Sequence, residues 1–480
     1  MINRKGKRFG FLSLRCGCTG YMQREERKEF SGKMQERARV FLMESVWSKT
    51  AELPQFQRLE GNVKTDVLII GGGITGILCA HFLQERGIDY VLVEGERICH
   101  GVTGNTTAKI TAQHGLTYAK LIRRAGLERA KLYLEANQEA VAKYAELAAE
   151  IPCDFAEKTA YVYSMDNRRK LEQEAEAYGM LGLDDKVVDP VELPFSTVGA
   201  VRMQRQAQFH PLRFLAGIAG GLNIFEHSFV TQLLPGKALT KEGSIAYQKA
   251  IFATHFPVDN KHGWYFLKLY QHRSYVIALE QAAQLKGMYV DEAKKGMSFR
   301  GYKDLLLVGG GSHRTGKKGG NWQELRDFAE RYYPRAVERY HWAAQDCMPL
   351  DEAPYIGVYS AAMPDCYVAT GFRKWGITSA MVSAMVLTDL VQGIENPYAE
   401  LFHPARSIWT KQLACNGAEA VLNMLTPTVP RCPHLGCALK WNRAEHSWDC
   451  PCHGSRFSEE GELLDNPAAG GLKKIGRKGN

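Results

Sequence analysis

The 480-residue sequence lacks an apolar run long enough to cross a membrane, and it lacks internal repeats and low-complexity tracts. Its longest apolar stretches are 67–80, which four glycines interrupt, and 376–391, which contains Asp389. A membrane-spanning helix needs about 20 apolar residues. Hydrophobic residues make up 45% and charged residues 24% of the chain, which is typical of globular domains. These values exclude a disordered or fibrous chain, and the length predicts about three domains.

Concentrated positive charge is absent from most of the chain, although the net charge is +9. Residues 1–42 hold 11 Lys and Arg against 4 Asp and Glu, which gives +7 and leaves +2 for the other 438 residues. We therefore expect no nucleic-acid partner and interpret residues 1–42 as an N-terminal extension without function. An RNA-binding or membrane-surface arm is the alternative. The extension has no apolar core of secretory length, which predicts a cytoplasmic protein.

A disulfide framework is absent as well. The 12 cysteines are scattered, apart from two groups: Cys16 and Cys18 in the extension, and Cys432, Cys437, Cys450 and Cys452 within 21 residues. Disulfide-rich secreted domains are small and use their cysteines evenly. The uneven pattern predicts one metal or redox site in a mostly reduced chain.

A glycine-rich turn between a strand and a helix is the first chemical feature present. Residues 66–70 are an apolar run typical of a buried strand. The pattern G-x-G-x-x-G follows, made of Gly71, Gly73 and Gly76 around Ile74 and Thr75. A helix is expected over 77–85, and a second strand over 90–93 ends at Glu94. This order is typical of a Rossmann-like dinucleotide-binding domain.

Each part of this pattern has a physical role in binding a dinucleotide. The first glycine allows a tight turn, the second lets the backbone approach a pyrophosphate, and the third lets helix and strand pack closely. The helix N-terminus offers free N–H groups and a positive dipole end to the phosphates. The Glu94 carboxylate can accept hydrogen bonds from a ribose diol.

Two later segments favour FAD as the dinucleotide. Residues 251–255 and 367–371 each end an apolar strand, and the second leads into a helix expected over 377–390. A reduced flavin gathers negative charge on one edge of its ring, which a helix N-terminus would stabilise. A core helix with a glycine-rich entry is the alternative.

Residues 43–405 resemble the FAD-dependent D-amino acid oxidase superfamily, in particular its γ-glutamylputrescine oxidase-like branch. The resemblance rests on five segments, which are Ser45-Val-Trp47 and residues 65–76, 101–109, 226–230 and 369–372. It implies an α/β fold, α+β overall, in which a Rossmann-like FAD-binding domain is interleaved with a mixed-sheet substrate domain. It also implies an oxidoreductase that acts on the CH–NH or CH–NH2 group of an amine or amino acid.

The same resemblance implies further contacts with FAD. Glu94 would bind the adenosine ribose, and the backbone of Val230 would meet the adenine. The segment from Thr103 through Thr107 to Lys109 would run beside the flavin ring. The pyrimidine edge of the ring would lie along Gly371, Trp375, Gly376 and Ile377.

Catalytic residues are not evident from the sequence, because flavin can accept a hydride without a protein acid or base. Lys109, His313, Arg314 and Tyr355 are weak candidates, and a structural role is the alternative for each. Residues 309–311 are three glycines after the apolar run 305–308. This order predicts that His313 and Arg314 lie on a loop at a strand end, where functional sites are frequent.

The second chemical feature lies near the C-terminus. Two ligand pairs, Cys432-x-His434 and Cys450-x-x-His453, are separated by 15 residues. A [2Fe–2S] cluster with cysteines on one iron and histidines on the other needs this arrangement, one thiolate and one imidazole from each of two loops. A structural zinc site is the alternative, although its cysteines are more often spaced C-x2–4-C.

The C-terminal segment strongly resembles Rieske [2Fe–2S] proteins. The resemblance implies a disulfide between Cys437 and Cys452, which would join the two cluster loops, and a bond from Ser455 to a bridging sulfide. Phe457 stands where a tyrosine hydroxyl would contact a ligand sulfur in the high-potential class. The missing hydrogen bond predicts a reduction potential below that of respiratory Rieske proteins.

The organisation that follows has three parts beyond the extension. Residues 43–405 are the oxidoreductase, 406–427 a linker helix, and 428–480 a shortened Rieske domain that needs support from its cluster, its disulfide or the flavin domain. We predict a two-centre enzyme in which electrons pass from FAD to the cluster and on to an unidentified acceptor. The alternative is a flavoenzyme whose Rieske-like module, held by iron or zinc, serves redox sensing or partner docking.

Overall fold

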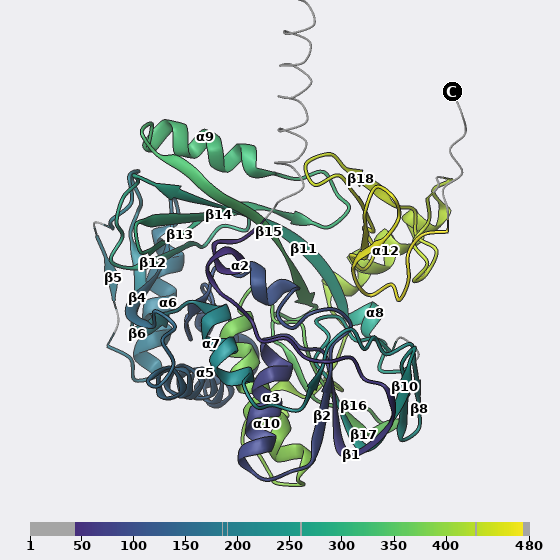
Figure 1. Ribbon diagram of the computed structural model, residues 1–480. Coiled ribbons are helices and arrows are strands. Elements are labelled where there is room, and N and C mark those ends of the chain that lie inside the picture. The colour runs from purple at the N-terminus through teal and green to yellow at the C-terminus, as the bar shows by residue number, and fades with distance from the viewer. Residues whose placement is uncertain (1–43, 185, 190, 260–261, 428–429, 474–480) are drawn as a thin grey trace, which may run out of the picture. The chain divides into compact units, whose positions relative to one another are not determined.

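The computed structural model describes residues 44–473 except 185, 190, 260–261 and 428–429. The extension predicted over 1–42 lies outside the described residues. The described chain forms two large sheets, a small C-terminal sheet and helices that pack on them (Figure 1). Within this part of the chain, no helix is long and apolar enough to cross a membrane.

The first sheet has the spatial order β16-β17-β10-β1-β2-β7, in which the five strands from β17 to β7 are parallel, and β9 and β8 extend from β10. Apolar runs form its centre because both faces of a parallel sheet are covered. The strands are β1 (Gly61–Ile70), β2 (Tyr90–Val93), β7 (Ile224–Phe225), β8 (Gln232–Leu234), β9 (Lys237–Leu239), β10 (Gly243–Phe252), β16 (Tyr355–Ser360) and β17 (Met363–Thr370). The strands predicted over 66–70 and 90–93 are therefore present.

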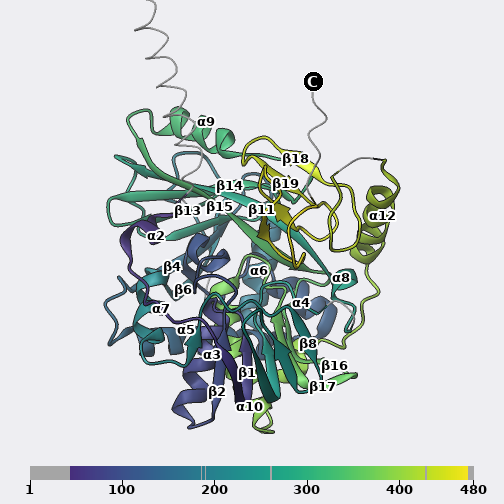
Figure 2. The same cartoon turned by 45° about the vertical axis from the view of Figure 1, so that its right-hand side comes forward.

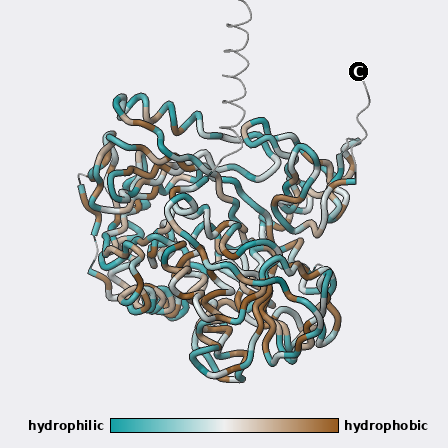
Figure 3. The backbone as a smooth tube through the Cα atoms, in the orientation of Figure 1, coloured by the Kyte–Doolittle hydropathy of each residue, from teal (hydrophilic) through white to brown (hydrophobic). Residues whose placement is uncertain are grey.

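Helices cover the first sheet and connect it to the second. The helices are α2 (Val46–Thr50), α3 (Ile74–Glu85), the 3-10 turn η1 (Val102–Asn105), α4 (Tyr118–Ala125), α5 (Leu127–Ala148), α6 (Arg168–Met180), α7 (Pro211–Ala219), α8 (Tyr265–Lys268), α9 (Trp322–Tyr332), α10 (Gly376–Val391), α11 (Ala399–Phe402) and α12 (Lys411–Leu425). α3 and α10 are almost wholly buried and pack on each other. Hydrophobic residues gather on these helices and on the strands beside them (Figure 3).

The second sheet is mixed and has the order β15-β11-β14-β13-β12-β4-β6-β3, with β5 paired to β6. Its strands are β3 (Lys109–Ile110), β4 (Ala156–Tyr163), β5 (Val187–Val188), β6 (Ala200–Gln208), β11 (Leu269–Glu280), β12 (Met288–Asp291), β13 (Ser298–Tyr302), β14 (Leu305–Arg314) and β15 (Val337–Pro349). The two large sheets give the α/β architecture with a mixed second sheet that the sequence predicted.

One prediction about this sheet was wrong. The glycines at 309–311 do not end a strand, because β14 continues through them to Arg314. The pairing with β11 is maintained on both sides of a register shift, with Gly310 opposite Tyr275 and His313 opposite Arg273. Gly311, at φ +63°, supplies the backbone conformation that the irregularity requires. His313 and Arg314 therefore lie on a strand that continues to the C-terminal segment, and no loop carries them.

The third sheet belongs to the C-terminal segment. It has four short strands in the order β18-β19-β20-β21, with bounds Lys440–Asn442, Ser447–Asp449, Arg456–Phe457 and Leu463–Asp465. α12 precedes it in the place predicted for the linker helix. The C-terminal strands lie beside β11 in both views (Figures 1 and 2), and buried hydrogen bonds join the two.

Candidate functional site

The glycine-rich turn between β1 and α3 is closed by contacts that only glycine permits. A Cβ on Gly76 would lie 1.9 Å from the carbonyl oxygen of Gly71, and a Cβ on Gly71 would lie 2.6 Å from that of Ala253. Gly71 also has φ +111°. α3 begins at Ile74, with Gly73 as its N-cap and Thr75 in its buried first turn. The turn thus brings the end of β10 against the N-terminus of α3.

Glu94 lies beside this turn. Its carboxylate accepts hydrogen bonds from the backbone N–H groups of Gly72 (2.7 Å) and Glu96 (2.9 Å). Burial raises the pKa of the carboxyl, and these N–H groups oppose the rise. The N–H of Ser228 donates to the Glu94 carbonyl, so the segment that carries Val230 starts next to Glu94.

The segment 103–109 is fixed by two indoles from distant parts of the chain. Trp47 Nε1 donates to the carbonyl of Thr106 (2.7 Å), and Trp342 Nε1 donates to that of Asn105 (2.9 Å). The Thr103 hydroxyl accepts from the N–H of Ile74 (3.1 Å). The segment is therefore attached both to the second sheet and to the first turn of α3.

The start of α10 meets the same region. Trp375 is the N-cap of α10, which continues through Gly376 and Ile377, and it stacks on the buried His114 at 5.0 Å between ring centroids. Gly371 (φ +74°) directly follows β17, the strand before α10. His114 Nε2 lies 2.9 Å from the Thr378 hydroxyl. No sequence pattern marks His114, which joins α10 to the segment after β3 through Thr378 and the Thr111 carbonyl.

Lys109 is the first residue of β3, the strand at one edge of the second sheet. Its ammonium donates to the hydroxyls of Thr107 (3.1 Å) and Ser298 (3.4 Å). Burial and the neighbouring Arg300 lower its pKa to about 7. Arg300 is itself fully buried, and its guanidinium packs 5.2 Å from the Trp47 ring. Two cationic side chains therefore lie at the edge of the segment 103–109.

The other three catalytic candidates lie elsewhere. Tyr355 packs under Arg406, 3.9 Å from ring to guanidinium carbon, and Asp351 pairs with the same arginine. His313 stacks on Tyr275 at 5.8 Å. Arg314 donates to backbone carbonyls of the C-terminal segment. Of the four candidates, only Lys109 lies at the segment 103–109.

The C-terminal segment brings together the four residues predicted to hold a cluster. Cys432 and Cys450 are buried in one cluster of side chains, and the centroids of the His434 and His453 rings lie 5.0 Å apart. Burial lowers the pKa of His434 to about 4 and that of His453 to about 3. Both imidazoles are therefore neutral near pH 7, as metal ligation requires.

Orphaned ligand atoms support this interpretation. Among the described residues, both ring nitrogens of His434 and Nδ1 of His453 are buried without a hydrogen-bond partner. Buried polar atoms without partners are costly, and an iron would supply the missing partner. The donor set of two thiols and two neutral imidazoles fits a Rieske cluster.

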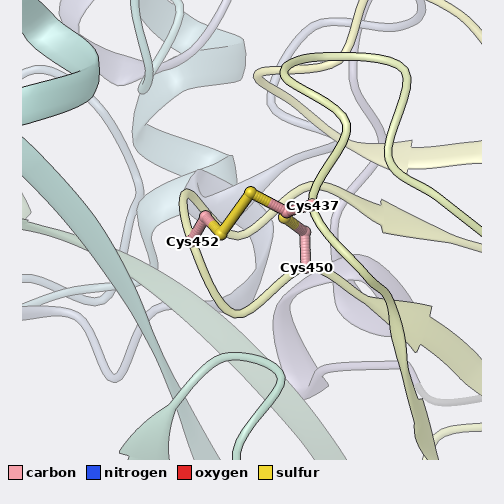
Figure 4. Close-up of side chains that lie close together, drawn as sticks. All are labelled: Cys437, Cys450 and Cys452. Atoms are coloured by element: carbon pink, nitrogen blue, oxygen red, sulfur yellow. A yellow bond between two sulfur atoms is a disulfide. The ribbon is translucent and has the colours of Figure 1, made fainter. Parts of the chain in front are cut away.

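Two more cysteines stand next to the ligands. Cys437 and Cys452 form a disulfide, and their sulfurs lie within 4.8 Å of the Cys450 sulfur (Figure 4). The buried Ser455 hydroxyl accepts from the N–H of Ala468 (3.0 Å). Phe457 is fully buried among the cysteines, so a hydroxyl is missing from this position.

Comparison with known proteins identifies two parts of the chain, a long one and a short C-terminal one. Residues 66–390 match the family model for FAD dependent oxidoreductases, and residues 417–476 match the Rieske [2Fe-2S] domain. The first match covers more than half of the chain. The chain therefore belongs to the FAD-dependent oxidoreductase family and carries a C-terminal Rieske domain, which implies FAD and a [2Fe–2S] cluster as its cofactors.

Similar proteins agree with this assignment. YhfW of Bacillus subtilis (strain 168), whose name describes a Rieske 2Fe-2S iron-sulfur protein, is 34% identical over 90% of this chain and 97% of its own length. The iron-sulfur subunit of the Arabidopsis thaliana cytochrome b6-f complex is 41% identical over 12% of this chain and 21% of its own length.

Solved structures share the fold of the larger part. Glycine oxidase from Geobacillus kaustophilus is 17% identical, with a TM-score of 0.61 over 72% of this chain and 99% of its own. L-amino acid deaminase from Proteus vulgaris is 14% identical, with a TM-score of 0.59 over 74% and 100%. At this identity the likeness shows the fold.

Proposed function

We propose that the protein oxidises an amine or an amino acid at FAD and passes the electrons to its own Rieske cluster. The observation that carries the proposal is the buried dock between the two parts of the chain. Arg273 of β11 and Glu445 of the Rieske domain form a buried ion pair, to which the Tyr275 hydroxyl donates (3.0 Å). A module used only to bind partners gains nothing from burying its cluster loop against the oxidoreductase.

The chain's own residues would hold FAD in the places described above. The turn at Gly71, Gly73 and Gly76 would receive the pyrophosphate, and Glu94 the adenosine ribose. The segment 103–109 and the start of α10 would lie along the flavin ring. Lys109, with a pKa near 7, can hold or release a proton at Nζ close to neutral pH.

The electron balance requires an external acceptor. Oxidation of a CH–NH group to an imine releases two electrons and two protons, which the bound flavin takes up, and a Rieske cluster accepts one electron at a time. Two electrons must therefore leave through the cluster in each turnover. We propose a one-electron redox protein as the acceptor. Water would hydrolyse an imine formed from a primary amine or amino acid to a carbonyl product and ammonia.

The cytoplasm is the compartment that we propose. Five buried cysteines in the oxidoreductase, Cys79, Cys99, Cys153, Cys347 and Cys366, are free thiols. Burial raises the pKa of the Cys79 thiol to about 12, so it is unreactive. In the part of the chain that the structure describes, one disulfide beside eight free cysteines fits a reducing compartment.

An anaerobic titration tests the proposed substrate class. The holoenzyme is mixed with a panel of primary amines, secondary amines and amino acids, and the flavin absorbance is followed. We expect at least one member to bleach the flavin. A Cys432→Ser variant, which loses a cluster ligand, should bleach equally but should not reduce ferricytochrome c, a one-electron probe. Failure of every panel member to bleach a flavin that dithionite does bleach would contradict the substrate class.

A further inference from the structure

Four consecutive carbonyls of the second cluster loop are bound by side chains of the oxidoreductase. Arg314 donates from Nε to the Pro451 carbonyl (3.0 Å) and from Nη2 to the Cys452 carbonyl (3.1 Å). The amides of two glutamines take the next two carbonyls. Gln271 donates to His453 (2.8 Å), and Gln345 donates to Gly454 (2.8 Å). We call Gln271, Arg314 and Gln345 the carbonyl clamp.

The clamp comes from three neighbouring strands of the second sheet. Gln271 lies on β11, Arg314 on β14 and Gln345 on β15, and β11 pairs with both of the others. Gln271 and Gln345 are each only 1% exposed. Gly454, at φ +86°, allows close approach, since a Cβ there would lie 2.6 Å from the Cβ of Gln271. The loop is therefore seated on a rigid surface.

The clamp turns the histidine edge of the cluster site toward the oxidoreductase. His453 Nε2 donates to the Phe266 carbonyl (2.9 Å), which leaves Nδ1 as the free ligand atom. The Phe256 ring lies 6.3 Å from the rings of both His434 and His453. The imidazoles thus meet the loop that follows β10, and they do not project into solvent.

That loop also reaches the glycine-rich turn. Asn466 of the Rieske domain donates to the carbonyls of Thr254 (2.7 Å) and Phe256 (3.0 Å). His255, between them, bonds to the Gln271 amide oxygen at 3.2 Å, and Ala253 touches Gly71. One short loop therefore contacts the expected pyrophosphate turn, the clamp and the cluster site.

We propose that the carbonyl clamp holds the Rieske module permanently docked, with its histidine edge as the entry point for electrons from the flavin. The clamp residues are positioning residues, because they touch the cluster loop and do not ligate the metal. This inference rests on the proposed electron transfer and adds its route. A module that swung between two partners would need to break these four hydrogen bonds on each visit, the two from the glutamines buried and the two from Arg314 partly buried.

Flash photoreduction of the holoenzyme tests the clamp without a substrate. Deazariboflavin reduces the protein anaerobically in a laser flash, and the exchange of electrons between flavin and cluster is followed by absorbance. The variant is Gln271→Met/Gln345→Met, which keeps the side-chain length and removes both donors. Gln323→Met, at an exposed glutamine of α9, is the matched control. Cluster content and EPR g-values are measured for each protein, and amide hydrogen exchange is measured over residues 450–456.

We expect an exchange rate in the wild type that does not depend on protein concentration. In the double variant, electron exchange between flavin and cluster should be slower by roughly tenfold or more, because small displacements of reacting groups are costly. Its amide hydrogens over residues 450–456 should exchange with solvent faster, while its cluster content stays the same. If electrons exchange between flavin and cluster at the same rate in the double variant as in the wild type, the proposed role of the clamp is wrong and the proposed function is unaffected. A wild type without any internal exchange would overturn both. If the double variant loses its cluster, Gln345→Met alone gives the same comparison.

Discussion

At the scale of single residues, we expect one position to affect the binding of FAD and another to affect the potential of the cluster. Gly76 faces the Gly71 carbonyl so closely that no side chain fits. Phe457 is buried among the cysteines of the C-terminal segment, where a tyrosine would add a hydroxyl. We predict that Gly76 is needed for flavin binding and that Phe457 lowers the cluster's potential.

Substitution of Gly76 by alanine should abolish FAD binding. A Cβ at 1.9 Å from the Gly71 carbonyl oxygen forces the turn open, at a cost of about 1–3 kcal/mol or more. The flavin-to-protein ratio of the purified variant, read from its absorbance, should fall to near zero. Gly179→Ala is the control, since a Cβ there meets nothing within 4 Å and the residue lies in α6, where alanine is favoured. A fully yellow Gly76→Ala protein would refute the pyrophosphate turn.

The variant Phe457→Tyr should raise the cluster potential. A new hydrogen bond to a ligand sulfur favours the reduced cluster. A bond worth about 0.5–1.5 kcal/mol corresponds to roughly 20–60 mV for one electron. An EPR-monitored redox titration measures the shift. An unchanged or lower potential would show that the residue 457 side chain does not reach the ligand sulfur.

At the scale of elements, the Rieske domain depends on charges buried between β11 and its own strands. Glu445 is completely buried between Arg273 and Arg456. Arg456 also pairs with Asp449 and Asp465. Buried charges are stable only when they are paired, so this network requires both parts of the chain.

The variant Glu445→Gln should release the Rieske domain from the oxidoreductase. It removes the carboxylate that Arg273 and Arg456 share. Arg456 keeps Asp449 and Asp465, whereas the buried Arg273 keeps a 3.9 Å contact with Asp465, and the loss costs about 3–5 kcal/mol. Calorimetry should show the domain unfolding ahead of the oxidoreductase, and proteolysis should cut the linker faster. The control is Glu280→Gln, at the end of β11. The Glu280 side chain pairs with Arg339 but is 27% exposed, so its replacement should cost less than about 1 kcal/mol. Equal stability of the two variants would contradict the dock.

The same carboxyl sets a pH dependence. Burial alone would raise the pKa of Glu445, but Arg273 and Arg456 lower it to about 2. The stabilisation is therefore complete above the ordinary value of 4.5 and is lost as the pH falls from 4.5 toward 2. The unfolding temperature of the Rieske transition should decline over this range in the wild type and decline less in Glu445→Gln.

At the scale of the whole molecule, the sequence predicted what is local and missed what is distant. The turn at Gly71–Gly76 and the pairs around Cys432 and Cys450 were visible because their chemistry depends on spacing within a few residues. The extended β14 was missed because its partner β11 determines where the strand ends. The clamp was invisible too, since three strands bring Gln271, Arg314 and Gln345 to one loop.

The central claim, that electrons pass from FAD to the cluster of the same chain, is tested most directly by rapid-freeze EPR. The holoenzyme is mixed anaerobically with the compound that bleaches its flavin, and samples are frozen at successive times. We expect flavin bleaching followed by the low-g rhombic signal of a reduced Rieske cluster, at a rate that is the same at all protein concentrations. A cluster that stays oxidised while the flavin is reduced, and that dithionite can still reduce, would contradict it.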